Sequence, residues 1–207
     1  MRRIAVLIGL AVVCSSALIA QGAREARETH HAQQAQDAQQ VTLHRVLATS
    51  KTSTMQREMQ EAGDAGFRLA AVMGGETAAG GKEAVVVMQK PAASTSKFEY
   101  RLLATNKTST MQKEMQAASD ADFQYVGQTV FETAFGGKEV VIIFERDPSV
   151  PSPPKYVYLL LATTKTSTME KELKQVGDAG YVVVGMTVAE TMVGGKEVVA
   201  ITRKPAR

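Results

Sequence analysis

One nine-residue segment occurs three times and sets the organisation of the chain. It reads "KTSTMQREM" at residues 51–59, "KTSTMQKEM" at 107–115 and "KTSTMEKEL" at 165–173. Its first residues, Lys51, Lys107 and Lys165, are 56 and then 58 positions apart. A second marker, Gly-Gly-Lys-Glu, follows at 80–83, 136–139 and 194–197 with the same two spacings. Self-similarity at a nearly fixed period indicates a tandem repeat protein.

The two markers divide most of the chain into three copies. We call them repeat 1 (residues 41–91), repeat 2 (97–147) and repeat 3 (155–205). The connecting segments are "PAASTS" (91–96) and "DPSVPSPP" (147–154). The second is the stiffer linker, because each proline fixes φ and favours extended chain.

Each copy predicts a strand, a helix and a hairpin in that order. In repeat 2, the strand at 98–102 alternates apolar and polar side chains, which is typical of a half-buried strand. Met55, Met59 and Ala62 then recur at the i, i+4, i+7 spacing of an apolar helix stripe. Repeat 3 ends in two β-rich runs around a Gly-Gly pair, which favours a hairpin with a type I′ turn.

The ends of the predicted helices carry local signals. Ser53, Ser109 and Ser167 are each followed three residues later by Gln or Glu, the spacing of a capping box, so each serine is predicted as the N-cap. Each helix should end near a repeated aspartate, which is Asp64 in repeat 1. Positive φ is expected just beyond, at Gly66, Asp122 and Gly180.

The last strand of each copy is apolar on both faces. In repeat 3, Val198, Ala200 and Thr202 alternate with Val199 and Ile201, and neither set is charged. We expect one face to be covered by the copy's own helix and the other by a neighbouring copy. A lone copy of ~50 residues also has too little core for comfortable stability. The predicted fold is therefore α+β: three tandem β-α-β-β repeats with antiparallel hairpins, whose sheets share a core in pseudo-three-fold fashion with the helices outside.

The segments 155–190 and 194–204, "KYVYLLLATTKTSTMEKELKQVGDAGYVVVGMTVAE" and "GGKEVVAITRK", resemble a family of small uncharacterised bacterial domains. That family opens with a K-Y-E-Y-K-V-type strand, continues with L-x-x-x-L-x-x-x-G-x-x-G-W-E-L-V and closes with a hairpin ending in F-x-R. The resemblance covers each copy. Two departures from the family pattern are aromatic residues in place of its Trp (Phe67, Phe123, Tyr181) and non-glycine residues in repeat 2 (Ser119, Asp122). It implies the β-α-β-β order and supplies no catalytic residue.

The first residues have the pattern of a secretory signal peptide. Met1-Arg2-Arg3 is a basic start, an apolar run to Cys14 follows, and small residues come next. We place cleavage after Ala17 or Ala20 and interpret residues 1–20 as a signal peptide, so the mature protein is expected to be periplasmic or secreted, without a membrane span. The alternative is an N-terminal membrane anchor, for which this apolar stretch is shorter than the ~20 residues that a spanning helix needs.

The segment that follows and the cysteine content limit the chemistry. Residues 21–40 are polar and rich in Ala and Gln, so they are interpreted as a flexible leader. His30 and His31 are adjacent there, but no further cluster completes a metal-binding shell, and neither a metal nor another cofactor is expected. Cys14 is the only cysteine and lies within the predicted signal. The mature protein is therefore expected to lack disulfides and thiol nucleophiles.

Charge gives no case for nucleic-acid binding. Removing Arg2 and Arg3 from the 24 basic residues leaves 22 against 21 acidic residues, a formal balance of +1. The chain has no Trp and no basic run, so neither phosphate binding nor base stacking is favoured.

No catalytic constellation recurs in the three copies. His44 is replaced by tyrosine in repeats 2 and 3, so a Ser-His or Cys-His arrangement cannot be built three times. Glu76 and Glu83 flank one hairpin and are the remaining pair of acids to consider for glycosidase-like chemistry, although nothing in the sequence indicates the buried environment that such chemistry needs. The chain is therefore predicted not to be an enzyme.

Two functions stay open. The first is an exported binding or structural module of the cell envelope, whose partner is an unknown protein or envelope component. The second is a small-ligand or anion sensor that uses the helix N-termini, where unpaired N–H groups attract negative charge. Its candidate contacts are the Lys and Thr residues of the repeated motif: Lys51, Thr52, Thr54, Lys107, Thr108, Thr110, Lys165, Thr166 and Thr168. Against the sensor, no glycine-rich phosphate loop precedes the motif.

Overall fold

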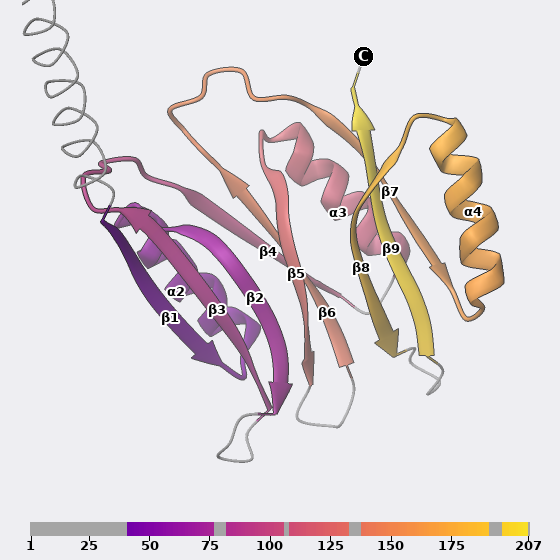
Figure 1. Cartoon of the computed structure of the whole chain (residues 1–207), viewed down its shortest axis with the longest axis horizontal. Helices are drawn as coiled ribbons and strands as arrows, with labels where there is room; N and C mark the ends of the chain where they lie inside the picture. The colour runs from indigo at the N-terminus through magenta and orange to yellow at the C-terminus, as the bar shows by residue number, and fades with distance from the viewer. Residues whose placement is uncertain (1–40, 77–81, 106–107, 133–137, 191–195, 207) are drawn as a thin grey trace, which may run out of the picture. The chain divides into compact units, whose positions relative to one another are not determined.

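The computed structural model describes residues 41–76, 82–105, 108–132, 138–190 and 196–206 (Figure 1). The predicted signal peptide (1–20), the leader (21–40) and the three Gly-Gly turns lie outside the described residues. Two compact units are present. The described part of the smaller unit is Val41–Thr42 with Pro91–Ala93, in which the Ala92 N–H donates to the Val41 carbonyl at 2.7 Å. The larger unit, 43–90 with 94–206, holds the three repeats.

Each repeat forms the predicted strand, helix and hairpin. Repeat 1 contains β1 (Thr42–Thr49), α2 (Thr52–Asp64), β2 (Arg68–Glu76) and β3 (Lys82–Pro91). Repeat 2 contains β4 (Glu99–Thr105), α3 (Thr108–Asp120), β5 (Gln124–Glu132) and β6 (Lys138–Arg146). Repeat 3 contains β7 (Tyr156–Thr163), α4 (Thr166–Asp178), β8 (Val182–Glu190) and β9 (Lys196–Pro205).

The last strand of each repeat lies at the centre of a three-stranded sheet. The strand orders are β1-β3-β2, β4-β6-β5 and β7-β9-β8, and each hairpin pairs in antiparallel fashion. The same register irregularity interrupts β2, β5 and β8, after Leu69, Tyr125 and Val183 respectively. A β-bulge at one position in all three copies re-aims the side chains that follow it. The predicted α+β class with three repeated units is confirmed.

The predicted helix ends are confirmed, and the predicted helix starts are wrong. Gly66, Asp122 and Gly180 have φ of 89°, 70° and 84°. The helices, however, begin at the threonine before each serine, and Lys51 is the N-cap of α2. In α2 and α4, which are fully described, no side chain caps the first turn. Ser53, Ser109 and Ser167 therefore lie one residue inside their helices and are exposed.

Before each of these two helices, a threonine hydroxyl, not the predicted serine, accepts a hydrogen bond from a backbone N–H. The Lys51 N–H donates to the Thr49 hydroxyl at 3.2 Å, and the Lys165 N–H donates to the Thr163 hydroxyl at 3.3 Å. These short side-chain turns fix the chain direction as it leaves the strand. In repeats 1 and 2 the glutamine of the supposed capping box binds the next repeat, as described below. In repeat 3 the helix starts at the same place, although Glu170 is exposed.

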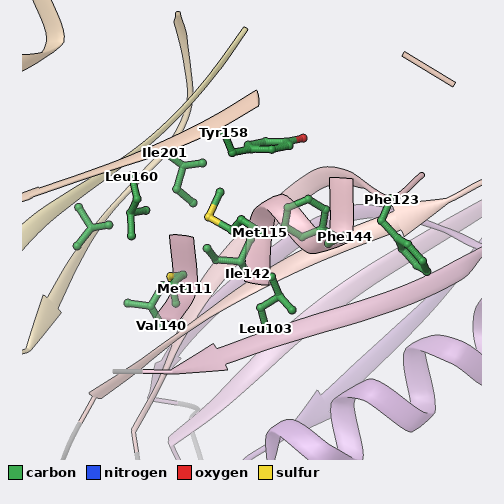
Figure 2. Packing of buried hydrophobic residues seen from close by; sticks show 12 residues of the cluster. Leu103, Met111, Met115, Phe123, Val140, Ile142, Phe144, Tyr158, Leu160 and Ile201 are labelled. Atoms are coloured by element: carbon green, nitrogen blue, oxygen red, sulfur yellow. The ribbon is translucent and has the colours of Figure 1, made fainter. Parts of the chain in front are cut away.

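The middle sheet, that of repeat 2, is covered on both faces. Val141 and Ile143 of β6 pack in one cluster with Met55, Met59 and other residues of repeat 1. Alternate residues of the same strand, Val140, Ile142 and Phe144, pack with α3 and with residues of repeat 3 (Figure 2). The expectation that a last strand is covered by its own helix and by a neighbouring copy is confirmed for β6.

The repeats share their cores in succession. The principal contacts between repeats join α2 to β4, β2 to β5, α3 to β7 and β5 to β8, with none of them between repeats 1 and 3 in the described residues. This refines the predicted pseudo-three-fold sharing to a series from repeat 1 to repeat 3. Each internal helix keeps an exposed stripe, such as Ser53, Arg57 and Glu61 of α2, while its other faces cover its own sheet and the next repeat.

A repeat without its neighbour should therefore not fold by itself. In a fragment of residues 154–207, the face of β9 that carries Val199 and Ile201 loses the α3 side chains that cover it. We expect this fragment to show no cooperative thermal transition by circular dichroism. The fragment 97–207 keeps that cluster and should melt cooperatively. A cooperative transition of fragment 154–207 at the melting temperature of the whole chain would contradict the shared core.

Candidate functional site

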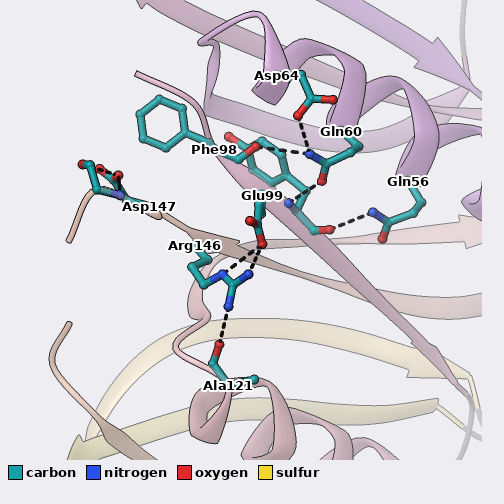
Figure 3. Close-up of polar contacts among 10 residues, drawn as sticks. Gln56, Gln60, Asp64, Phe98, Glu99, Ala121, Arg146 and Asp147 are labelled. Carbon is teal, nitrogen blue, oxygen red and sulfur yellow. Dashed lines mark hydrogen bonds and ion pairs between the residues drawn. The ribbon is translucent and has the colours of Figure 1, made fainter. Parts of the chain in front are cut away.

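Two glutamines of α2 bind the backbone of the next repeat. Gln56 donates through Nε2 to the Tyr100 carbonyl at 2.8 Å and accepts from the Leu102 N–H at 2.7 Å. One turn later, Gln60 accepts from the Tyr100 N–H at 3.0 Å and lies 3.4 Å from the Phe98 carbonyl (Figure 3). A primary amide offers a donor and an acceptor, as a peptide group does. The two side chains therefore pair with the edge of β4 as another strand would.

The same joint connects repeat 2 to repeat 3. Gln112 donates to the Tyr158 carbonyl at 2.7 Å and accepts from the Leu160 N–H at 2.7 Å. Gln116 accepts from the Tyr158 N–H at 3.3 Å and lies 3.4 Å from the Tyr156 carbonyl. Open strand edges are prone to pair with other chains, and these amides cover two of them.

Repeat 3 breaks this pattern. The positions of the two glutamines are held by Glu170 and Lys174, and both are exposed. An ionised carboxylate only accepts hydrogen bonds and an ammonium group only donates them. Neither side chain can match a strand N–H and a carbonyl at once, so α4 does not carry the strand-binding chemistry of α2 and α3.

A buried tyrosine completes each joint. The Tyr100 hydroxyl accepts from the Leu69 N–H at 2.9 Å, where β2 is interrupted, and the Tyr158 hydroxyl accepts from the Tyr125 N–H at 3.1 Å in the corresponding place. Burial, reinforced by the carboxylate of Glu145, raises the pKa of Tyr100 far above its usual value. In repeat 1 the equivalent residue is His44, which is exposed.

The joint between repeats 1 and 2 also contains an ion pair between the exposed Arg68 and the buried Glu145. The Arg68 guanidinium donates to one Glu145 oxygen at 2.6 and 2.9 Å, and the Tyr100 hydroxyl donates to the other at 2.7 Å. Glu145 is only 5% exposed. Its hydrogen bond to Arg68 raises the pKa of that guanidinium further. Since both carboxylate oxygens have donors, this glutamate is committed to holding the two repeats together.

A cavity of about 260 Å³ lies beside this ion pair. It is lined by Arg68, Asp122, Gln124, Val126, Glu145, Asp147, Val150, Pro153 and Pro154. Asp122 is paired with Lys155 at 2.7 Å, and Glu145 is bound as described. The lining therefore has little free charge with which to hold a ligand.

The residues of the alternative anion site start three separate helices. Lys51, Lys165 and Thr166 are exposed, as is Thr108, and the side chains of Thr52, Thr54, Thr110 and Thr168 are half-buried. Lys107 lies outside the described residues. The Thr52 hydroxyl donates to Glu139 of the next repeat at 3.4 Å, so the start of α2 already faces a carboxylate. No pair of helices is among the principal contacts of the described chain.

Glu76 and Glu83, the acids considered for glycosidase chemistry, are not paired with each other across the hairpin. The sheet register places Glu76 opposite Lys82 and Glu83 opposite Gly75. In a pleated strand, adjacent positions point to opposite faces of the sheet. Glu76 and Glu83 are therefore not cross-strand partners in this hairpin.

An apolar surface is left open on repeat 3. In repeat 1, Leu69 and Val72 are half-buried against repeat 2, and in repeat 2, Tyr125 and Val130 pack against the cluster shared with repeat 3. The corresponding side chains of β8 are exposed by half of their area or more: Val183 51%, Met186 55% and Val188 53%.

The helix beside this surface also lacks a neighbour. A Cβ added at Gly63 of α2 would collide with the Phe98 carbonyl oxygen of the next repeat. Among the described atoms, nothing lies within 4 Å of a Cβ at the equivalent Gly177 of α4. We call the surface formed by Glu170, Lys174 and Gly177 of α4 with Val183, Met186 and Val188 of β8 the C-terminal face. It is the surface that repeats 1 and 2 use to bind the repeat that follows each of them.

Sequence reasoning did not find this face. The glutamine pairs were visible at i and i+4 in repeats 1 and 2, as was their change to Glu170 and Lys174 in repeat 3. That difference between copies is the signal that could have identified it, because Glu and Lys side chains cannot pair with a strand edge as a glutamine amide does.

Comparison with protein-family models, with curated proteins and with solved structures finds no match to this chain. The resemblance to a family of small bacterial domains therefore stays a prediction. Within the described ranges, no helix has the length and apolar character to cross a membrane. The same part of the chain holds no group of three or more His, Cys, Asp or Glu side chains placed to bind a metal ion.

Loss of the glutamine joints should destabilise the protein. Replacing Gln112 or Gln116 with Ala leaves edge groups of β7 without partners at a partly buried joint, and each change should lower the free energy of unfolding by about 1–3 kcal/mol. The matched changes Glu170→Ala and Lys174→Ala, at exposed positions, should each stay within about 0.5 kcal/mol. Urea denaturation measures both. Equal effects in the two repeats would contradict the joint.

Proposed function

We propose that this chain is an exported, non-enzymatic repeat protein that acts as a binding or structural module of the cell envelope. The observation that carries the proposal is the C-terminal face. Val183, Met186 and Val188 are each more than half exposed, although their counterparts in the preceding repeats pack against a neighbour. Contiguous exposed apolar side chains with a polar rim are characteristic of interaction sites.

The polar groups at the joints support a role in binding rather than catalysis. Glu145 is held by Arg68 and Tyr100, and Glu99 is paired with Arg146, which also reaches the Ala121 carbonyl (Figure 3). These bonds consume charge that a catalytic site would need free. The series of repeats then provides a stable support that carries this apolar surface.

Export rests on the sequence pattern of residues 1–20. The protein recovered from the periplasm or the medium should begin between Leu18 and Arg24, and it should contain no free thiol because Cys14 is removed. Intact-mass measurement with and without thiol alkylation tests this. A species that begins at Met1 and stays in the membrane fraction would contradict it.

The binding role is tested by photo-crosslinking in the cells that make the protein. A photoreactive amino acid at Met186 should give a crosslinked product, because that side chain lies on the C-terminal face. The control position is Lys171, which is exposed and corresponds to Arg57 on the stripe that stays exposed even in an internal repeat. A product at Met186 but not at Lys171 supports the proposal. Absence of any product at Met186 would contradict it.

A further inference from the structure

The C-terminal face differs from the internal joints in one respect that identifies its occupant. Glu170, Lys174 and Gly177 follow the i, i+4, i+7 spacing of one helix stripe and correspond to Gln56, Gln60 and Gly63 of α2. Gly177 matches Gly63, although repeat 2 has Ser119 at this position. The surface of β8 is apolar, with Met186 in place of the Gln128 of repeat 2. The strand-binding amides are replaced by one negative and one positive side chain. The surface is retained as an interface, but its partner is not an edge strand.

Head-to-tail docking of a second copy meets poor complementarity. The exposed surface of repeat 1 carries His44 where repeats 2 and 3 have the buried tyrosine of the joint. It also carries Ala71 where those repeats have glycine. A Cβ at Gly127 would lie 3.2 Å from Leu69 and 3.3 Å from Val72, and one at Gly185 would collide with the Tyr125 hydroxyl. Repeat 1 is therefore not shaped to fit against repeat 3 as an internal repeat would.

A second copy docked by the same face fits the charges. In a two-fold interface each residue meets the same patch of the partner, so the patch must be self-complementary. When two α4 helices pack antiparallel about one two-fold axis, Glu170 of each copy lies next to Lys174 of the other. We infer that two copies of this chain associate through their C-terminal faces about a two-fold axis, with these two ion pairs and the β8 side chains at the contact.

The apolar side chains of the face stabilise the dimer. The charged side chains determine how the two α4 helices align against each other. Burying Val183, Met186 and Val188 of both copies removes side chains that are now 51%, 55% and 53% exposed. The open space at Gly177 lets the partner helix come close. Ion pairs at the rim contribute little affinity, but like charges placed opposite one another disfavour the complex. This inference rests on the proposed function, because it names the partner of the face proposed there.

Sedimentation equilibrium of the purified mature chain tests the inference. We expect a monomer–dimer equilibrium. Glu170→Lys and Lys174→Glu should each weaken the dimer by about tenfold, since each turns both attractive pairs into repulsive ones. The double swap Glu170→Lys with Lys174→Glu should restore it, because the patch is again self-complementary. Met186→Asp should abolish the dimer, whereas Lys171→Glu should leave it unchanged. Circular dichroism on each variant confirms that the fold is kept.

Each other outcome overturns the inference. A monomer at all concentrations, an open series of larger oligomers, or a dimer that is indifferent to Glu170→Lys and Met186→Asp would each do so. The crosslinking at Met186 separates this failure from that of the proposed function. A monomeric protein that crosslinks there to a different protein loses the two-fold inference and keeps the binding role, whereas a monomeric protein with no crosslink loses both.

Discussion

The fold depends on the side-chain amides that join each helix to the edge of the next sheet. A three-stranded sheet of this size has two faces and two open edges, and one helix covers only part of them. Gln56 and Gln60 satisfy the backbone of β4, while Met55 and Met59 on the adjoining stripe of the same helix are completely buried in the core that the two repeats share. One helix thus closes the edge of one sheet and fills the space between two. The repeats are stable as a series because each supplies what the next one lacks.

The sequence was sufficient for those features that depend on local chemistry. The three copies, the helix ends at positive φ and the two-sided β6 follow from period, glycine placement and apolar alternation, and all three are present. The helix start was wrong because Ser-x-x-Gln has two physical meanings. The spacing that would let Gln56 reach back to its own helix end also lets it reach out to β4, and it does the latter, as Gln112 does to β7. Joints between copies depend on contacts that no single copy contains, so a pattern within one copy could not reveal them.

The tyrosine at each joint illustrates the same limit. Tyr100 and Tyr158 appeared in the sequence as aromatic strand residues, which is a correct but incomplete description. Their hydroxyls accept from backbone N–H groups at the interrupted strand of the preceding repeat, so each ring closes one defect in a different copy. His44 occupies this position in repeat 1, and it is exposed. The change from His to Tyr along the chain thus follows the presence of a neighbour.

Residues that are identical in the three repeats and residues that differ among them therefore indicate different things about the structure. Thr52 and Glu139 belong to residues that are the same in all three repeats, and the structure joins them across the first joint, which accounts for part of the repeated motif without a ligand. The glutamine pair and the tyrosine are present at both joints, whereas the Arg68–Glu145 pair occurs at the first joint alone among the described residues. In α4 the two glutamines are replaced by Glu170 and Lys174, while the apolar side chains beside them on β8 are exposed by half of their area or more. Exposed apolar area together with changed polar groups is therefore the observation on which the proposed interface rests.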